Sequence, residues 1–322
     1  MMRRSRPLGP ALVDAVEAAI RQEIPAREIE GILDNIGIPN SGISLSYSNN
    51  GLIGTGDADI LVSLRPEHHA TGDYVRRLRQ RLNREFAATS FYFLPADIVS
   101  QTINFGLPAP FDIQIVGREQ SAHRVIAAKL ADKIRRIPGA VDVRVQQPAD
   151  QPRFLVNVNR DKSAEIGLTE RDVANSVLLS LSGSGQVTPS YWLNPAVGIQ
   201  YLVNVRVPEY AMNSLESLAG LPVSASLNGA GDGQVLANLA TLVRTNAPAV
   251  VSHYNVMPVI DVFGGVDGRD LAGVMHDLQP LIEEARKELP RGSYIVMRGQ
   301  AEAMNSSFNG LLTGLVGSIV LV

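Results

Sequence analysis

The fold is decided by the stretch Phe111-Asp-Ile-Gln-Ile-Val-Gly117, in which apolar and polar residues alternate as they do in a strand. A helical pattern follows it, ends at Arg135-Arg-Ile-Pro-Gly139, and leads into another strand pattern. The same order recurs from Val259-Ile-Asp-Val-Phe-Gly-Gly265 through a helix that ends at Lys287-Glu-Leu-Pro-Arg-Gly292. Two such strand–helix–strand units of similar size predict an α+β fold, a ferredoxin-like sheet with its helices on one face.

Further elements are predicted on both sides of this core. Apolar residues three and four positions apart predict helices over residues 71–86, 119–137 and 268–289, and a capping box at Thr169-Glu-Arg-Asp172 predicts a fourth to about residue 180. Alternating apolar residues predict strands near residues 43–47, 60–64, 113–115, 141–145, 154–158, 201–207, 260–262 and 295–297. Residues 181–252 are rich in Gly, Ser, Asn and Pro and carry no strong helical pattern, which predicts a mostly β insert.

Composition narrows the function classes. The chain has 322 residues, 45% of them hydrophobic and 19% charged, which is typical of a folded protein of two or three domains. A net charge of −3 disfavours nucleic acid as the main partner, because phosphate binding needs a basic surplus. The absence of cysteine excludes disulfides, thiolate nucleophiles and cysteine-based metal centres.

No catalytic motif is recognisable in the chain. The five histidines include no pair with His-x-x-x-His spacing, and neither a Gly-x-Ser-x-Gly elbow nor a phosphate-binding Gly-x-x-x-x-Gly-Lys loop occurs. Asp57 and Asp59 share a face of a predicted strand, but with no partner base or ligand nearby they are expected to face solvent. The sequence therefore predicts a protein that is not an enzyme and has no cofactor or metal centre.

The two ends of the chain differ. Near the start, Pro7, Pro10, Asp14 and Glu17 interrupt any apolar core, so no secretory signal is expected. From Gly310 to the last residue the chain is uncharged and mostly apolar, yet this run is shorter than the roughly 20 residues of a spanning helix. We expect residues 306–322 to be the start of a truncated transmembrane helix; the alternative is a buried C-terminal helix.

Five ordered segments resemble the resistance-nodulation-division efflux transporters, and the resemblance extends over about residues 13–322. They are Pro95–Gly117, Arg136–Arg144, Ile166–Ala174, Val250–Asn255, and the run from Arg298-Gly-Gln300 to Ser307-Phe308 with the apolar tail behind it. The resemblance implies the second of the two large periplasmic loops of such a transporter. It implies a first porter subdomain over residues 1–108, a second over 109–180 and 254–305, and a docking insert over 181–253.

The resemblance also implies a cargo and partners. Metal exporters of the family use cleft methionines, and no methionine stands between Met2 and Met212, so the hydrophobe/amphiphile multidrug branch and lipophilic or amphiphilic substrates are expected. The intact pump would be a homotrimer in the bacterial inner membrane, facing the periplasm, with a periplasmic adaptor and an outer-membrane channel. This chain would not transport alone, because the helices that carry the proton relay are missing from it.

Two candidate cargo-contacting features follow from the same resemblance. Phe91 and Phe93 stand where the family has an aromatic pair at the pocket through which substrate enters; the alternative is core packing. Gly51, Gly54 and Gly56 lie in a stretch that corresponds to a mobile loop between pockets; the alternative is a plain hairpin connection. A soluble ferredoxin-like module that binds small molecules is the alternative function, whereas an acyl-phosphate hydrolase lacks a convincing Arg and Asn pair.

Overall fold

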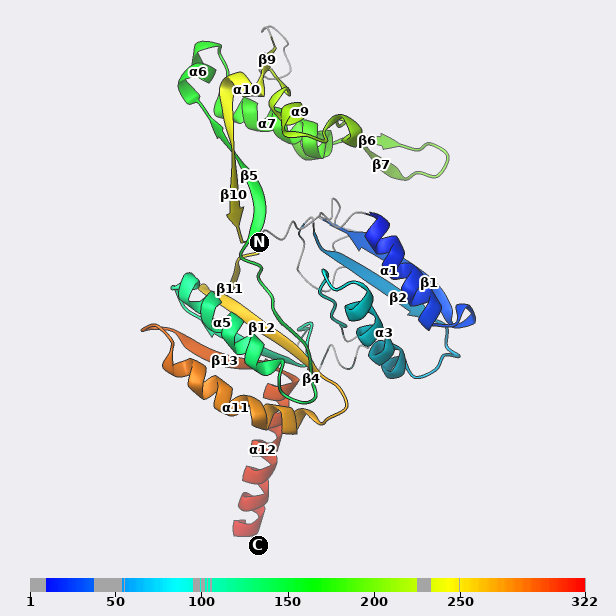
Figure 1. The fold of residues 1–322 in the computed structure, drawn as a ribbon, viewed down its shortest axis with the longest axis vertical. Coiled ribbons are helices and arrows are strands. Elements are labelled where there is room, and N and C mark those ends of the chain that lie inside the picture. The colour runs from blue at the N-terminus through cyan, green and yellow to red at the C-terminus, as the bar shows by residue number, and fades with distance from the viewer. Residues whose placement is uncertain are drawn as a thin grey trace. The chain divides into compact units, whose positions relative to one another are not determined.

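The computed structural model describes residues 10–37, 54, 56–94, 99, 102, 104, 106–224, 233–248 and 250–321. The chain forms two compact units (Figure 1). Unit 1 comprises Met1–Gln151 and Pro248–Val322, and unit 2 comprises Pro152–Ala247. The strand predicted over residues 43–47 lies outside the described residues.

The first part of unit 1 packs two helices against a two-stranded sheet. Helices α1 (Pro10–Glu23) and α3 (Thr71–Glu85) flank the 3₁₀ turn η1 (Ala26–Glu28) and the antiparallel strands β1 (Ile29–Ile36) and β2 (Ala58–Leu64). The shared core is made by side chains at helical spacing in α1 and α3: Val16, Ala19, Ile20, Tyr74, Leu78 and Leu82. The helix predicted over residues 71–86 is confirmed, whereas α1 and β1 were not predicted.

The second part of unit 1 is the ferredoxin-like sheet that the sequence predicts. Along the sheet the strands run β4 (Ala140–Val145), β12 (Met257–Val266), β3 (Phe111–Val116) and β13 (Tyr294–Gly299), and every neighbouring pair is antiparallel. A short strand, β11 (Ser252–Tyr254), also pairs with β12. Helices α5 (Gln120–Ile134) and α11 (Leu271–Lys287) cover one face, where Ile113 and Ile115 of β3 lie in the core (Figure 1).

Unit 2 is built on a long ribbon of β5 (Gln151–Val158) paired with β10 (Ala240–Ala247). Its main helix, α7 (Glu170–Ser182), opens with the predicted capping box, in which Thr169 and Asp172 bond each other's backbone amides. The remaining elements are short: α6 (Arg160–Glu165), α8 (Ser184–Val187), β6 (Ser190–Leu193), β7 (Gln200–Val203), η2 (Glu209–Ala211), α9 (Leu215–Ala219), β8 (Pro222–Val223), β9 (Gln234–Val235) and α10 (Leu236–Leu239).

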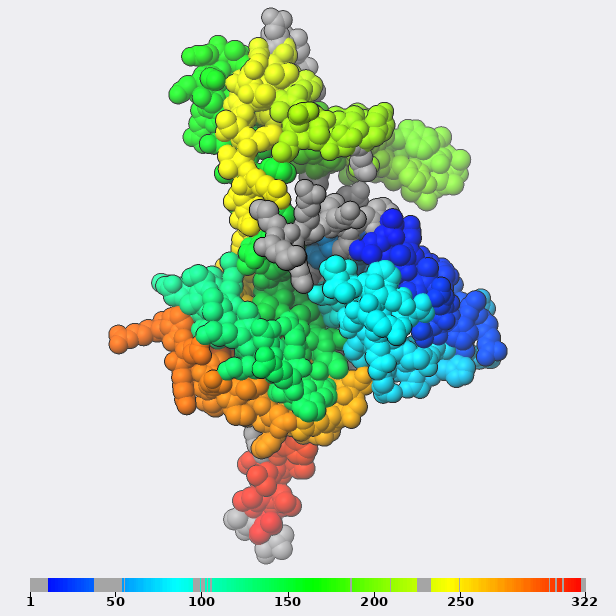
Figure 2. Space-filling view, viewed as in Figure 1, coloured from blue at the N-terminus to red at the C-terminus, as the bar shows by residue number. Residues whose placement is uncertain are grey.

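The boundaries of unit 2 differ from those predicted for the insert. Residues 152–180, which include most of β5 together with α6 and α7, were assigned to the second porter subdomain but lie in unit 2. The physical reason is their packing: Val156 and Val158 of β5 lie against the buried core of unit 2 around Val173 and Leu236. The β6–β7 hairpin exposes Tyr191, Trp192 and Tyr201. In Figure 2 it is the light-green lobe of unit 2.

The last element is α12 (Gln300–Leu321), which follows β13 in unit 1 and projects as a red rod in Figure 2. Its exposed side chains include Phe308, Leu311, Leu312, Leu315, Val316 and Ile319. Among the described residues, no helix combines the length and the apolarity that crossing a membrane requires.

Candidate functional site

The end of the glycine-containing loop is fixed to the strand that follows it. The amide of Gly54 donates to Asp57 Oδ2 at 3.0 Å, and the amide of Asp57 donates to the Gly54 carbonyl at 3.1 Å. Gly54 is buried beside Gln151, so a side chain at this position would collide with that glutamine. Gly56 has open space around it, and Gly51 lies outside the described residues.

Two carboxylates follow this loop directly. Asp57 precedes β2 and Asp59 lies in it, and both are half-buried, not fully solvated as expected. Burial raises the pKa of Asp57; the Gly54 amide opposes that rise, and the charge of Asp59 adds to it. Because the charge of Asp59 makes the ionised form of Asp57 less favourable, a cation bound between them would relieve the repulsion.

The aromatic pair lies on different elements from the glycine loop. Phe91 and Phe93 follow α3, are half-buried, and pack against the core formed by α1, α3 and the β1–β2 sheet. The Phe91 ring meets Phe86 edge-on with the ring centroids 6.0 Å apart, and the guanidinium of Arg79 lies 5.2 Å from the centroid of Phe93. Both rings therefore contact the core, while each keeps part of its surface exposed.

Arg79 forms an ion-pair network beside Phe93 that the sequence did not reveal. Its Nε and Nη2 donate to the two carboxylate oxygens of Asp142 at 2.8 and 2.9 Å, and its Nη1 donates to Asp267 at 2.8 Å. The backbone amide of Phe93 also donates to Asp142, at 3.2 Å. The side chains of Arg79 and Asp142 are only 16% and 7% exposed. This network joins α3 and the segment after it to the start of β4 and to the β12–α11 loop.

A second polar cluster holds the first part of unit 1 together. Glu28, 2% exposed, accepts hydrogen bonds from the His69 amide at 2.9 Å and the Tyr74 hydroxyl at 2.7 Å, and it contacts His69 Nδ1 at 2.8 Å. The His69 amide, the Tyr74 hydroxyl and the His69 ring together lower the pKa of Glu28 to about 2. His69 thus ties the loop after β2 to η1.

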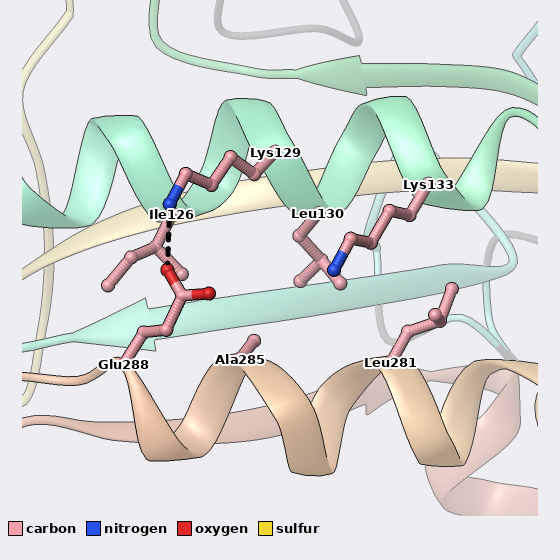
Figure 3. A pocket seen from close by; sticks show the side chains of 7 residues that line it. All are labelled: Ile126, Lys129, Leu130, Lys133, Leu281, Ala285 and Glu288. Atoms are coloured by element: carbon pink, nitrogen blue, oxygen red, sulfur yellow. Dashed lines mark hydrogen bonds and ion pairs between the residues drawn. The ribbon is translucent and has the colours of Figure 1, made fainter.

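The groove between α5 and α11 is too small for a lipophilic or amphiphilic cargo molecule (Figure 3). Its cavity volume is about 10 Å³, room for one water molecule at most. Lys129 pairs with Glu288 at 2.9 Å across the groove, and Lys133 pairs with Glu284 at 2.7 Å. Across the described ranges, no three side chains among His, Asp and Glu are grouped so that they could hold a metal ion.

Comparison with known proteins finds relatives over most of the chain. The sequence model of the AcrB/AcrD/AcrF family matches residues 40–322. The cobalt-zinc-cadmium resistance protein CzcA of Cupriavidus metallidurans is 25% identical over 221 residues, which are 67% of this chain and 20% of that protein. The cation efflux system protein CusA of Escherichia coli K12 is 24% identical over 204 residues, 63% of this chain and 18% of that protein.

A solved structure has the same fold. The crystal structure of a heavy metal efflux pump, in crystal form I, superposes with a TM-score of 0.73 at 19% sequence identity. The match covers 97% of this chain and 31% of that one. The chain thus spans about a fifth of the length of the curated relatives it matches and about a third of the solved pump.

Proposed function

Because the chain belongs to the AcrB/AcrD/AcrF family of resistance-nodulation-division efflux transporters, we propose that it forms the periplasmic porter and docking portion of a pump that exports divalent heavy-metal ions. The family consists of transporters and not of enzymes, and its members are inner-membrane proteins with porter domains in the periplasm. The observation that carries the cargo is the kinship with proteins named for cation efflux and for cobalt, zinc and cadmium resistance.

The donor chemistry of the chain supports divalent ions of intermediate hardness. Soft ions such as Cu(I) select thiolate and thioether ligands, and the chain has no cysteine and no methionine between Met2 and Met212. Zn²⁺ is a borderline ion that accepts Asp and Glu oxygens as well as nitrogen and sulfur ligands, so carboxylates can contact it without any methionine or cysteine. The absence of methionine from this part of the chain therefore argues against soft ions and does not by itself favour a lipophilic cargo.

We place the cargo contact at Asp57 and Asp59, beside the glycine loop. Both carboxylates are half-buried, and the repulsion between them favours an incoming cation over a neutral molecule. The Gly54 amide fixes one oxygen of Asp57 at 3.0 Å, which leaves the carboxylate oriented by the loop.

Calorimetric titration of the chain with Zn²⁺ and Co²⁺ tests this placement. The chain should bind these ions, and the double variant Asp57→Asn, Asp59→Asn should lose at least tenfold in affinity, since it keeps the shape of the site and removes its charge. Asp161→Asn, an exposed carboxylate in unit 2, is the matched control and should bind as the unchanged chain does. Equal affinity in the double variant would refute the placement.

Export of lipophilic compounds is the second candidate, favoured by the half-buried pair Phe91 and Phe93. Their partly exposed rings would form an apolar contact surface for such a cargo. Titration with a fluorescent lipophilic dye distinguishes the two candidates. Saturable dye binding that Phe91→Ala or Phe93→Ala abolishes, with no binding of metal ions, would favour lipophilic export.

We further propose that unit 2 makes the docking contacts of the intact pump. Pumps of this family form trimers and work with a periplasmic adaptor and an outer-membrane channel. The exposed aromatic residues of the β6–β7 hairpin are suited to such contacts, because aromatic side chains are enriched at protein interfaces. Expressed alone, the chain should confer no resistance to metal ions or drugs in an efflux-deficient host; measurable resistance would contradict its role as a portion of a pump.

A further inference from the structure

The face of the ferredoxin-like sheet that is turned away from α5 and α11 carries a buried polar cluster. Asp112 and Gln114 alternate with the core residues of β3, so both point to this second face. The strand register places Asp261 of β12 opposite Gln114, and Arg298 of β13 opposite Asp112. Asp112 is 0%, Asp261 7% and Gln114 9% exposed, so the cluster is closed to solvent.

The hydrogen bonds of the cluster leave oxygen atoms without donors. Gln114 Nε2 donates to Asp112 Oδ2 at 2.8 Å, and Gln147 donates to Asp261 Oδ2 at 2.5 Å. Three buried acceptors have no partner: Asp112 Oδ1, Asp261 Oδ1 and Gln114 Oε1. Two buried donors near Asp112, Arg144 Nη2 and Arg298 Nε, also have no partner, so the three acceptors outnumber the unpaired donors by one. Because buried polar atoms are nearly always satisfied, the cluster lacks one donor.

The charges around the cluster indicate which donor it is. Arg298, opposite Asp112, is already paired with Glu302 of α12 at 2.9 Å and also bonds the hydroxyl of Tyr254. Arg144 of β4 lies 3.6 Å from the ring centroid of Tyr92, and the neighbouring Asp142 is matched by Arg79. Glu302 is 41% exposed and therefore partly solvated, whereas Asp112 and Asp261 are buried and accept no hydrogen bond from either guanidinium group. With both aspartates ionised, two buried negative charges would lack a direct ion pair.

We propose that Asp112 and Asp261 hold one proton between them in the folded protein and form a proton-binding site on this face of the sheet. One proton supplies the missing donor, because a carboxylic acid donates through its hydroxyl while a carboxylate only accepts. It also removes one of the two buried negative charges. The site lies in the periplasmic fold, and the assignment is independent of which cargo the pump exports.

Electrostatics supports this assignment in both residues. Burial raises the pKa of Asp112 well above its usual range and the charge of Asp261 raises it further, against the Gln114 hydrogen bond and the charges of Arg298 and Arg144. Burial also raises the pKa of Asp261, against the hydrogen bonds from Gln147 and Gln114. A divalent cation fits the cluster less well than a proton, because Arg298 and Arg144 repel it and the site is closed.

Urea unfolding of the chain between about pH 4 and pH 8 tests the proposal, for the unchanged protein and for Asp112→Asn. The folded state binds the extra proton, so the unchanged protein must lose stability as the pH rises above the unfolded aspartate pKa of about 3.9, by up to roughly tenfold in the folding constant per pH unit. Asp112→Asn mimics the protonated acid and should lack this decline. Asp161→Asn, the exposed control, should decline as the unchanged protein does.

A second measurement covers the case in which Asp112→Asn fails to fold. Infrared spectra of the folded, unchanged chain at about pH 6 should show the carbonyl band of a protonated carboxylic acid, which free aspartate has lost at this pH. The band should disappear in Asp261→Asn and persist in Asp161→Asn. Parallel unfolding curves for the unchanged protein and Asp112→Asn, or no acid band, would overturn the proposal. So would stabilisation by Zn²⁺ that Asp112→Asn or Asp261→Asn abolishes.

Discussion

Unit 1 buries acidic side chains in both of its parts, but the pKa of the buried acid is lowered in the first part and raised in the second. Glu28, beside α1 and α3, receives hydrogen bonds from the His69 amide and the Tyr74 hydroxyl, and its pKa falls to about 2. Asp112, in the ferredoxin-like sheet, has one amide donor and another carboxylate nearby, and its pKa rises. Both side chains are at most 2% exposed, so burial alone does not decide the charge of a carboxyl group.

The comparison shows that the number and placement of donors decide whether a buried acid is ionised. Glu28 has donors for both of its oxygens, which compensates for lost water. Asp112 and Asp261 each keep one oxygen without a donor. We therefore expect Glu28 to act as a fixed negative clamp and the aspartate pair to respond to pH, and the following predictions test this difference.

The largest effect is expected where a buried acid depends on a charged partner. Arg79→Met keeps the apolar contact with Phe93 but leaves Asp142 buried with only the Phe93 amide, which should cost about 3 kcal/mol of unfolding free energy. Urea unfolding measures this loss. The control is Arg76→Met on the same helix: Arg76 is 52% exposed, and its loss should cost about 0.5 kcal/mol or less. Equal losses would show that the Arg79 network contributes no more than a surface pair.

A smaller but clear loss is expected from Glu28→Gln. The amide keeps the size of the side chain but turns one acceptor oxygen into a donor that faces the Tyr74 hydroxyl or the His69 amide, so the melting temperature should fall by several degrees at neutral pH. Since the folded pKa of Glu28 is depressed, its contribution is complete above about pH 4.5 and disappears as the pH falls toward 2. Thermal melts at several pH values measure both effects.

The control for this clamp is Glu30→Gln, an exposed neighbour on β1, which should melt as the unchanged protein does. A Glu28→Gln variant whose deficit stays constant down to about pH 2 would contradict the low pKa. The deficit would then come from packing and not from charge.

Removing the aromatic side chains after α3 should destabilise the protein less than Glu28→Gln does. Phe91→Ala and Phe93→Ala remove half-buried rings from the edge of the core, for an expected loss of about 1–2 kcal/mol, below the 3–5 kcal/mol of a fully buried phenylalanine. In the full-length pump, an altered export spectrum at unchanged abundance would make the rings cargo contacts. A stability loss with an unchanged spectrum would assign them to the core alone.

The smallest effect is expected at the surface of the second part. Lys129→Ala breaks the exposed pair with Glu288 across the α5–α11 groove, and because Lys129 is 57% exposed the loss should be about 0.5 kcal/mol or less and should vanish in high salt. Urea unfolding with and without salt measures it. If Lys129→Ala lowered the unfolding free energy as much as Arg79→Met does, solvent exposure would not explain the difference between the Lys129–Glu288 and Arg79–Asp142 ion pairs.

The ferredoxin-like sheet could be predicted from the sequence, because each of its helices and strands buries apolar side chains at the regular spacing of that element. The spacing of Ile126, Leu130 and Ile134 in α5 and the alternation of Ile113 and Ile115 in β3 each match one face of the core. The sequence does not predict helix α1, because Asp14 and Glu17 interrupt its apolar residues. They lie on the outer side of a helix whose Val13, Val16 and Ile20 are buried.

The polar sites were harder to predict, because they depend on partners distant in the chain. Asp112 and Asp261 stand in the two strands that decide the fold, and alternation alone places them on the outer face. Only the structure shows that this second face is covered. Similarly, the alternation from Phe154 to Val158 predicts a strand, but it does not show that β10 of unit 2 is its partner.

The central claim, that this chain is the porter portion of a heavy-metal exporter, is tested most directly by exchange into a relative. The matching segment of CzcA would be replaced by this chain, and growth on cobalt, zinc and cadmium measured in a sensitive host. We predict that the chimera restores growth on these ions and that Asp57→Asn with Asp59→Asn abolishes it at equal abundance. A chimera present at normal abundance that protects against lipophilic dyes and not against metal ions would contradict the account.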